Sequence, residues 1–231
     1  MKSLKLSLLA AIGALSFGAA AHAEDKPVSV TFNVGAATDY VFRGVSQTDE
    51  NAQIYGGADA TLGKIGYAGV WLSNVDFNNG TSMEYDLYAG IKPTVGPVAL
   101  DLGVIRYGYT NQPSGPHEDY VEWKVAGSVP AGPATIGAAV YYSDDFFGET
   151  GPATYYELNG SSPIPNTKFS VSGAVGRQIV KGPLDYTTWN LGVGYAINDH
   201  IGLDLRYWDT DEHSFGSIYD SRAVLGIKAT F

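Results

Sequence analysis

The sequence predicts an all-β fold, a transmembrane antiparallel up-and-down β-barrel of about 12 strands with short periplasmic turns and longer extracellular loops. Three observations predict it. Apolar and polar residues alternate with a period of two through segments of roughly ten residues, as in strands with one face in lipid and one in water. The connections between these segments alternate between short and long. The 231 residues include 29 Gly and 16 Tyr but only 2 Met, and no segment keeps a helical period.

The first residues have the order of a secretory signal peptide. Lys2 and Lys5 precede an apolar run rich in Ala and Gly, and the small-residue sequence Ala21-His22-Ala23 follows it. The run is short for a membrane anchor and ends at a typical cleavage sequence. We therefore expect a signal peptide over 1–23 and a β-barrel over 24–231. No other apolar run approaches the ~20 residues of a spanning helix.

Twelve alternating segments account for the rest of the chain. In the first, "VSVTFNVGAATDYVFRG", Phe32 and Phe42 share the apolar face, and Asp39 and Arg43 share the polar face. We expect the apolar faces to meet lipid and the polar faces to meet water inside the barrel. The predicted strands are 28–44, 52–62, 65–76, 83–92, 97–109, 118–129, 133–144, 153–160, 167–178, 186–197, 200–209 and 219–231.

The connections give the barrel its two ends. "GKI", "KPTVGP", "PAGP" and "IND" are tight turns rich in Gly, Pro and Asn, and we place them in the periplasm. Longer links such as "TNQPSGPHED", "SDDFFGETGPA" and "DTDEHSFGSI" lie between them and are expected to be extracellular. "SSPIPN" is a periplasmic turn by count, yet it is long and rich in proline. The register around residues 145–167 is therefore left open.

A soluble β-sandwich also has alternating strands, and three features favour the barrel over it. Charged residues recur in the middle of strands on the polar face. The last strand, "AVLGIKATF", ends on Phe231 and resembles the signal read by the outer-membrane barrel-assembly machinery, which we expect as a partner. Aromatic residues also lie near strand ends, where they would form membrane-interface belts. They are Tyr40, Phe42, Tyr107, Tyr109, Tyr141, Tyr142, Tyr195, Tyr207 and Trp208.

Three stretches carry a family resemblance: "TDYVFRGVSQTDENAQIYGGADA", "YAGVWLSNVDF" and "EYDLYAGIKPTVGPVALDLGVIRYGY". They resemble the TorF-type porins of Proteobacteria, a group formerly described as conserved hypothetical proteins. The resemblance covers nearly the whole mature chain and is strongest from Asn33 to Tyr109. It implies an outer-membrane β-barrel of a Gram-negative bacterium, with lipid around it and channel activity. It supports the fold more firmly than the identity of a solute.

Charged residues on the polar faces are the candidate pore-lining residues. One interpretation is a constriction whose charges sort small solutes by sign. The other, which we favour for most of them, is that acids and bases pair across neighbouring strands and fill the interior. Inward Tyr55, Tyr88, Tyr107 and Tyr120 could line the same space. The candidates are Asp39, Arg43, Asp59, Glu84, Asp86, Asp101, Glu122, Lys124, Asp204, Arg206, Arg222 and Lys228.

Other chemistries have weaker support. A net charge of −10 argues against nucleic acid as a partner, and the absence of cysteine excludes disulfides. His213, with Asp209, Glu212 and Ser214 beside it, would suit a hydrolase at the extracellular rim, but an exposed acidic loop explains the same residues. Acidic loop clusters resemble loose calcium ligands, yet none has the spacing of an EF-hand. We therefore expect no cofactor, no specific metal site and no enzymatic activity.

The leading hypothesis is thus a porin-like channel for passive diffusion of small hydrophilic solutes across the outer membrane. The first alternative is a closed barrel with a structural or adhesin-like role that acts through its extracellular loops. The second is a hydrolase at the extracellular rim. The sequence leaves open the solute, the charge preference, whether the lumen is open, and the oligomeric state.

Overall fold

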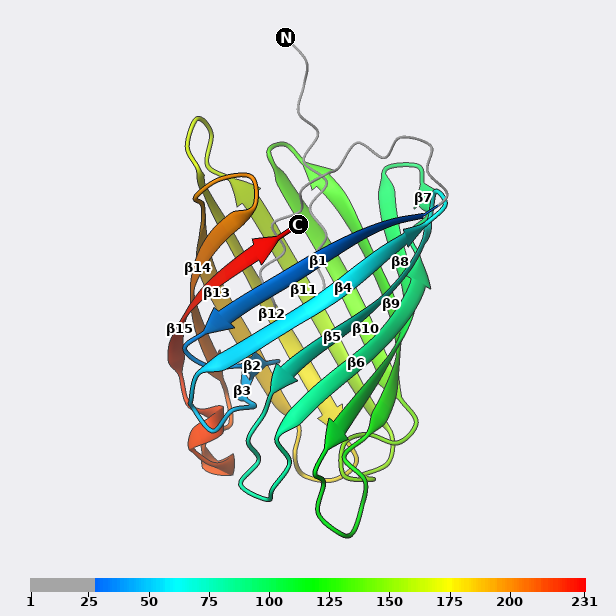
Figure 1. Ribbon diagram of the computed structural model, residues 1–231, viewed down its shortest axis with the longest axis vertical. Helices are drawn as coiled ribbons and strands as arrows, with labels where there is room; N and C mark the ends of the chain where they lie inside the picture. Colours follow the sequence, from blue (N-terminus) through cyan, green and yellow to red (C-terminus); the bar gives the residue numbers. More distant parts are fainter. Residues whose placement is uncertain (1–27) are drawn as a thin grey trace.

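The computed structural model describes residues 28–231 (Figure 1). The expected signal peptide, 1–23, lies outside the described residues. The regular secondary structure within them is almost entirely β-strand, with two short 3-10 helices, η1 (His213–Phe215) and η2 (Ser217–Tyr219). No helix in this part of the chain is both long and apolar enough to cross a membrane.

Twelve antiparallel strands form a closed barrel, as the sequence predicts. Each strand pairs with its neighbours in sequence, β6 pairs with β8, and the pairing of β1 with β15 completes the ring. The twelve strands are β1 (Val28–Ala37), β4 (Gln53–Leu62), β5 (Gly66–Asn74), β6 (Met83–Ile91), β8 (Val98–Thr110), β9 (Tyr120–Ala131), β10 (Ala134–Ser143), β11 (Ala153–Pro163), β12 (Phe169–Val180), β13 (Tyr186–Ala196), β14 (Ile201–Thr210) and β15 (Arg222–Thr230). Closure leaves no open edge, so every strand has partners for its backbone groups on both sides.

The two faces of the strands differ as a membrane barrel requires. Outward side chains are large, apolar and exposed: Phe32 is 57% exposed, Trp123 58% and Leu191 66%. Side chains at the alternate positions point inward and include most of the buried polar and charged groups. Because lipid makes no hydrogen bonds, an exposed apolar surface around a closed polar interior fits a bilayer better than water.

The connections sort to two ends of the barrel. The short-turn end carries 63–65, 92–97, 132–133, 164–168 and 197–200, and it also holds the beginning of β1 and the end of β15 (Figure 1). The opposite, long-loop end carries 38–52, 75–82, 111–119, 144–152, 181–185 and 211–221. The "SSPIPN" turn is shorter than its letters indicate, because β11 and β12 stay paired to Pro163 and Ser170. That pairing supplies the register that the sequence leaves open.

The first predicted strand is much too long. The sequence predicts 28–44, but β1 ends at Ala37 and the chain then turns into the barrel. There it forms a small hairpin, β2 (Val41–Phe42) with β3 (Val45–Ser46), which is visible inside the barrel wall in Figure 1. Positive φ angles at Arg43 and Gly44, 50° and 87°, make this turn. The alternation of residue types continues past Ala37, but the backbone is no longer extended through a sheet, so the period no longer reports two faces.

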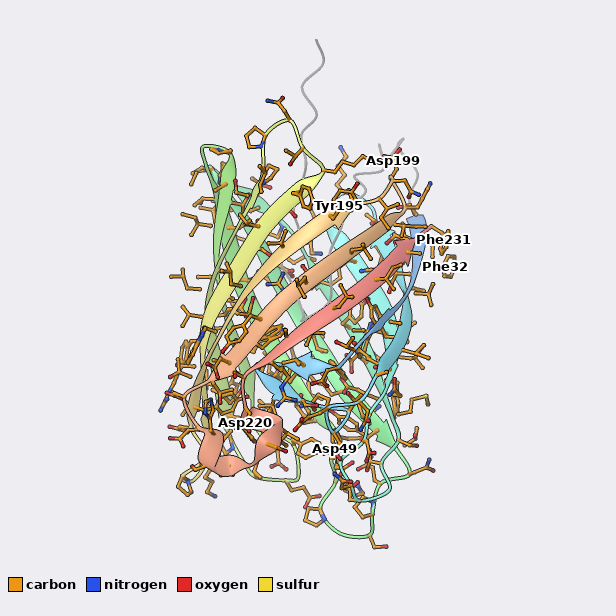
Figure 2. All side chains as sticks on the ribbon, turned by 90° about the vertical axis from the view of Figure 1, so that its left-hand side faces the viewer. Phe32, Asp49, Tyr195, Asp199, Asp220 and Phe231 are labelled. Atoms are coloured by element: carbon orange, nitrogen blue, oxygen red, sulfur yellow. The ribbon has the colours of Figure 1, made fainter. Side chains whose placement is uncertain are left out.

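The predicted aromatic belts are partly wrong, because several of their residues lie in the inserted hairpin or at inward positions of regular strands. Phe32, Phe169, Tyr195 and Phe231 do lie outward at the short-turn end, where Figure 2 labels three of them. Of the predicted belt residues, Tyr142 and Tyr207 also point outward. The others named here lie in the interior instead: Tyr40, Phe42, Tyr107, Tyr109, Tyr141 and Trp208.

Candidate functional site

The barrel interior is the candidate site, and the segment 38–52 occupies its long-loop half. We call this stretch the inserted segment. Hydrogen bonds within the segment hold its shape. The Ser46 hydroxyl donates to the Asp39 carboxylate at 2.7 Å, and the backbone N–H of Gln47 donates to the backbone carbonyl of Tyr40 at 2.7 Å. The Thr48 hydroxyl accepts a bond from the Tyr40 amide at 3.1 Å and lies 2.9 Å from Asp39. The segment is therefore an ordered hairpin.

Three side chains attach the inserted segment to different parts of the barrel wall. The Tyr40 hydroxyl donates to Glu84 on β6 at 3.0 Å. Asp39 accepts from Arg222, at the beginning of β15, at 2.9 Å. Arg43 reaches β9 and β12. Because these attachments lie on separate sides of the ring, the segment crosses the interior instead of lining one wall.

Arg43 enters a cage of complementary groups, which we call the guanidinium cage. Its two terminal nitrogens donate to the two carboxylate oxygens of Glu122 at 2.8 and 2.7 Å, and one of them also donates to Gln178 at 3.0 Å. Its guanidinium carbon lies 4.3, 4.8 and 4.6 Å from the ring centres of Tyr155, Tyr141 and Phe42. A forked pair with aromatic rings around it is the strongest arrangement that a protein offers a guanidinium.

The cage is closed to solvent. Arg43 is 7% exposed and Glu122 is 1% exposed. The Tyr107 hydroxyl donates to the same Glu122 carboxylate at 3.1 Å, and its ring stacks on Tyr120 with centres 4.4 Å apart. Breaking one partner of such a pair leaves the other charge buried and uncompensated. The cage therefore attaches the inserted segment to the wall through a buried charge pair.

Glycine allows the inserted segment to approach the wall. A Cβ on Gly44 would collide with Thr188 and Thr210, and its φ of 87° is one that L side chains rarely adopt. On the wall, a Cβ on Gly176 would collide with the Tyr155 ring that lies across it. Both glycines therefore fix the shape of the cage through close packing.

Two further carboxylates lie beside the inserted segment, on β6. Glu84 accepts the bond from Tyr40, and Asp86, 1% exposed, has no hydrogen-bond partner for either oxygen among residues 28–231. The neighbouring Trp71 also has an unpartnered ring nitrogen within the same described range. The long-loop half of the interior thus carries more buried acid than base, since Arg43 is paired with Glu122 and Arg222 with Asp39.

The other half of the interior is more open and its charges are balanced. Lys124 donates to Asp101 at 2.7 Å, and the side chain of Lys92, 29% exposed, lies 4.0 Å from the same carboxylate. Arg206 lies 3.1 Å from Asp204 and also donates to Asn190 and to Ser172. Lys124 and Asp204 are buried in these pairs, whereas the side chains of Lys92 and Arg206 stay partly open to solvent.

All twelve predicted pore-lining residues lie on the interior side of the wall or in the inserted segment. Eight form ion pairs: Arg43 with Glu122, Arg222 with Asp39, Lys124 with Asp101, and Arg206 with Asp204. Asp59 accepts a hydrogen bond from the Tyr88 hydroxyl at 2.6 Å. Burial places Glu84, Asp86 and Lys228 in the interior, and none of them has an ion-pair partner among residues 28–231. That these residues line a pore stays a prediction.

Some placements differ from the sequence interpretation. Asp39 and Arg43 do not share one strand face, because both belong to the inserted segment. Sequence analysis missed Gln178 and Tyr155 as cage residues and assigned Tyr141 to a belt. The sequence did contain a signal for Tyr141. Residues alternate between the two faces of β10, so Tyr141 must point inward if its neighbour Val140 points outward.

In the last acidic loop at the long-loop end, His213 is paired with a carboxylate. His213 lies 2.8 Å from Asp209, and this hydrogen bond raises the pKa of the histidine above its usual value. The Ser214 hydroxyl donates to Glu212 and not to the histidine ring. Among residues 28–231 no group of three or more His, Cys, Asp and Glu side chains is arranged to hold a metal ion. Figure 2 shows Asp49 and Asp220 at this end and Asp199 at the other.

Several solved structures share the fold. The KdgM porin is similar with a TM-score of 0.63 and 6% identity, over 87% of this chain and 99% of that one. The NanC porin is similar with a TM-score of 0.61 and 10% identity, over 88% and 99%. An outer-membrane channel from Pseudomonas putida F1 is similar with a TM-score of 0.56 and 11% identity, over 89% and 96%. At these identities the likeness concerns the fold.

Sequence comparisons place the chain in a family without a known function. A family model described as "Bacterial protein of unknown function (Gcw_chp)" matches residues 20–231. No curated protein matches the sequence.

Proposed function

The chain belongs to the Gcw_chp family, and we propose that it is an outer-membrane channel for passive diffusion of small hydrophilic solutes, constricted by the inserted segment. The observation that carries the proposal is the closed twelve-strand ring with apolar side chains outside and charged ones inside. Passive diffusion needs no cofactor and no energy source. It needs only a wet interior and a barrier that sets size and charge.

The two halves of the interior supply these functions separately. The short-turn half, with its balanced pairs around Asp101 and Asp204 and the partly exposed side chains of Lys92 and Arg206, suits a water-filled vestibule facing the periplasm. The long-loop half, where Arg43 and Glu122 are buried, suits the constriction facing the outside. The similarity to KdgM, NanC and the Pseudomonas putida channel supports this proposal because all three are described as porins or outer-membrane channels.

Liposome swelling tests the proposal. The refolded mature chain is inserted into liposomes loaded with an impermeant polymer, and swelling is followed in neutral sugars and polyols of increasing size. We expect swelling above the rate of empty liposomes, falling steeply as the solute grows. Swelling equal to that of empty liposomes, both for the native chain and for a variant in which Arg43→Gly and Tyr40→Phe remove two of the three attachments of the inserted segment, would contradict a channel.

One observation favours a second candidate, the closed structural or adhesin-like barrel. The inserted segment is ordered and attached through Asp39, Tyr40 and Arg43, so the long-loop half is filled in this structure. A barrel that never opens would act through its long loops. The variant with Arg43→Gly and Tyr40→Phe separates the two candidates, because it would conduct solute only if a continuous path exists beneath the inserted segment.

A further inference from the structure

The guanidinium cage is built almost entirely by the barrel wall, while its occupant comes from the inserted segment. Glu122 lies on β9, Tyr141 on β10, Tyr155 on β11 and Gln178 on β12. Arg43 and Phe42 belong to the hairpin and would leave with it. Four consecutive strands thus present a carboxylate, an amide oxygen and two aromatic rings to a single planar cation.

We propose that this wall site binds guanidinium-bearing solutes and that Arg43 is its built-in competing occupant. The inference rests on the proposed function for the route by which a solute reaches the interior. A free alkylguanidinium would repeat the contacts of Arg43: the two bonds to Glu122 at 2.8 and 2.7 Å, the bond to Gln178 and the faces of both tyrosines. Binding of such a solute and seating of the inserted segment would then exclude each other.

The geometry selects guanidinium over other cations. Glu122 receives two parallel N–H bonds, which a planar fork can donate and a compact ammonium group cannot donate in the same way. The flat rings of Tyr141 and Tyr155 lie 4.8 and 4.3 Å from the guanidinium carbon, at distances suited to stacking of a delocalised cation. An alkylammonium would keep the charge attraction but lose the fork.

The carboxylates around the cage attract a cation, whether it is the Arg43 side chain or a free solute, and repel an anion. If the inserted segment moves out, Glu122 loses its counter-ion, while Glu84 and Asp86 remain on the nearby wall without a basic ion-pair partner in the described chain. An uncompensated carboxylate in a partly enclosed space attracts cationic solutes. The same charge that holds Arg43 would therefore recruit its competitor.

The first test empties the cage without altering its wall. In Arg43→Gly the φ of 50° is readily adopted by glycine, so the hairpin can keep its turn. The thermal unfolding of the refolded variant is measured with methylguanidinium chloride and with methylammonium chloride at equal concentration. We expect the Tm to rise with methylguanidinium concentration and to approach saturation, with a much smaller rise for methylammonium.

Two matched variants define the site. In Arg43→Gly with Glu122→Gln, the amide no longer accepts two charged bonds, and we expect the apparent affinity for methylguanidinium to fall about tenfold or more. Arg106→Ala empties a pair that faces outward, where the Asp119 carboxylate lies 2.7 Å from the arginine and is partly exposed. The Tm of Arg106→Ala should show no saturable rise with methylguanidinium concentration. Equal rises in all variants, or equal rises with both cations, would overturn the proposal.

A second measurement uses the native chain, in case Arg43→Gly does not fold. Amide hydrogen exchange of peptides covering 38–52 is followed with each cation. Competition predicts severalfold faster exchange in methylguanidinium than in methylammonium, confined to the inserted segment. Unchanged exchange would overturn the proposal. Neither measurement depends on conduction, so a chain that binds but does not conduct refutes only the channel, and one that conducts without binding refutes only the cage.

Discussion

At the scale of single residues, the interior is organised by one buried ion pair. Arg43 and Glu122 are both almost fully buried. Besides bonding to each other, Arg43 donates to Gln178 and Glu122 accepts from the Tyr107 hydroxyl. A buried pair is not by itself strongly stabilising, but breaking it is costly because one charge stays uncompensated. The consequences of substituting either residue are therefore large and specific.

Glu122→Gln tests this cost. The amide cannot accept two charged bonds, so Arg43 is left buried beside a neutral group, and we expect a loss of about 3–5 kcal/mol in the free energy of unfolding. Thermal unfolding in detergent, followed by the shift of the folded band on gels, measures it. Asp119→Asn is the matched control, since its pair with Arg106 is partly exposed and contributes about 0–1 kcal/mol. Equal losses in the two variants would contradict a buried, organising pair.

Gly176→Ala tests the packing behind the cage. A methyl group there would collide with the Tyr155 ring, so the ring must move from its place beside Arg43. We expect a loss of about 1–3 kcal/mol in the free energy of unfolding, the usual cost of overpacking. The control is Gly160→Ala on the neighbouring strand, where the added methyl meets only an ordinary contact, 3.6 Å from the Thr135 carbonyl oxygen. If Gly160→Ala lowers the free energy of unfolding as much as Gly176→Ala does, the loss comes from replacing any strand glycine and not from the collision with Tyr155.

The pH response of the last long loop depends on His213. Its hydrogen bond to Asp209 raises the pKa of the folded state, so the stabilisation of the loop is complete below the unfolded pKa and disappears as the pH rises through the folded value. Titration of the histidine ring by NMR should give a midpoint that falls in Asp209→Asn. An unchanged midpoint would show that Asp209 does not hold the imidazolium.

At the scale of elements, the inserted segment departs from the barrel pattern, because its strands β2 and β3 form a separate small sheet inside the ring. It is ordered by internal bonds around Asp39 and attached to the wall by a few polar contacts. The barrel strands, in contrast, are held by continuous ladders on both sides. An element with few attachments can open locally while the scaffold stays closed.

Removing two attachments should therefore loosen only this element. In Asp39→Asn with Tyr40→Phe, the bonds to Arg222 and Glu84 are weakened or lost. We expect at least about tenfold faster amide exchange over 38–52, the equivalent of ~1.4 kcal/mol, and unchanged exchange in the strands. Glu50→Gln, an exposed position on the same segment, is the control and should exchange like the native chain. Faster exchange throughout the barrel would mean that the segment is part of the scaffold.

At the scale of the whole molecule, the sequence predicts the ring and the charged residues that lie inside it, but neither the inserted segment nor the pairs that these residues form. The period of two predicts twelve strands because every strand has one face in lipid and one inside, as Leu191 and Asp204 illustrate. The same period misleads at Phe42, where residue types alternate but the backbone turns. The cage joins residues 79 and 135 positions apart, Arg43 with Glu122 and with Gln178. No local pattern records such contacts, because closure and insertion create them.

The central claim is that the barrel encloses a water path whose constriction is the inserted segment. The most direct measurement is planar-bilayer conductance of the native chain beside the variant with Arg43→Gly and Tyr40→Phe, under a salt gradient. The account predicts small or intermittent currents for the native chain, several-fold larger and steadier currents for the variant, and a reversal potential that shows a preference for cations. Identical currents from both chains, or none from either, would contradict it.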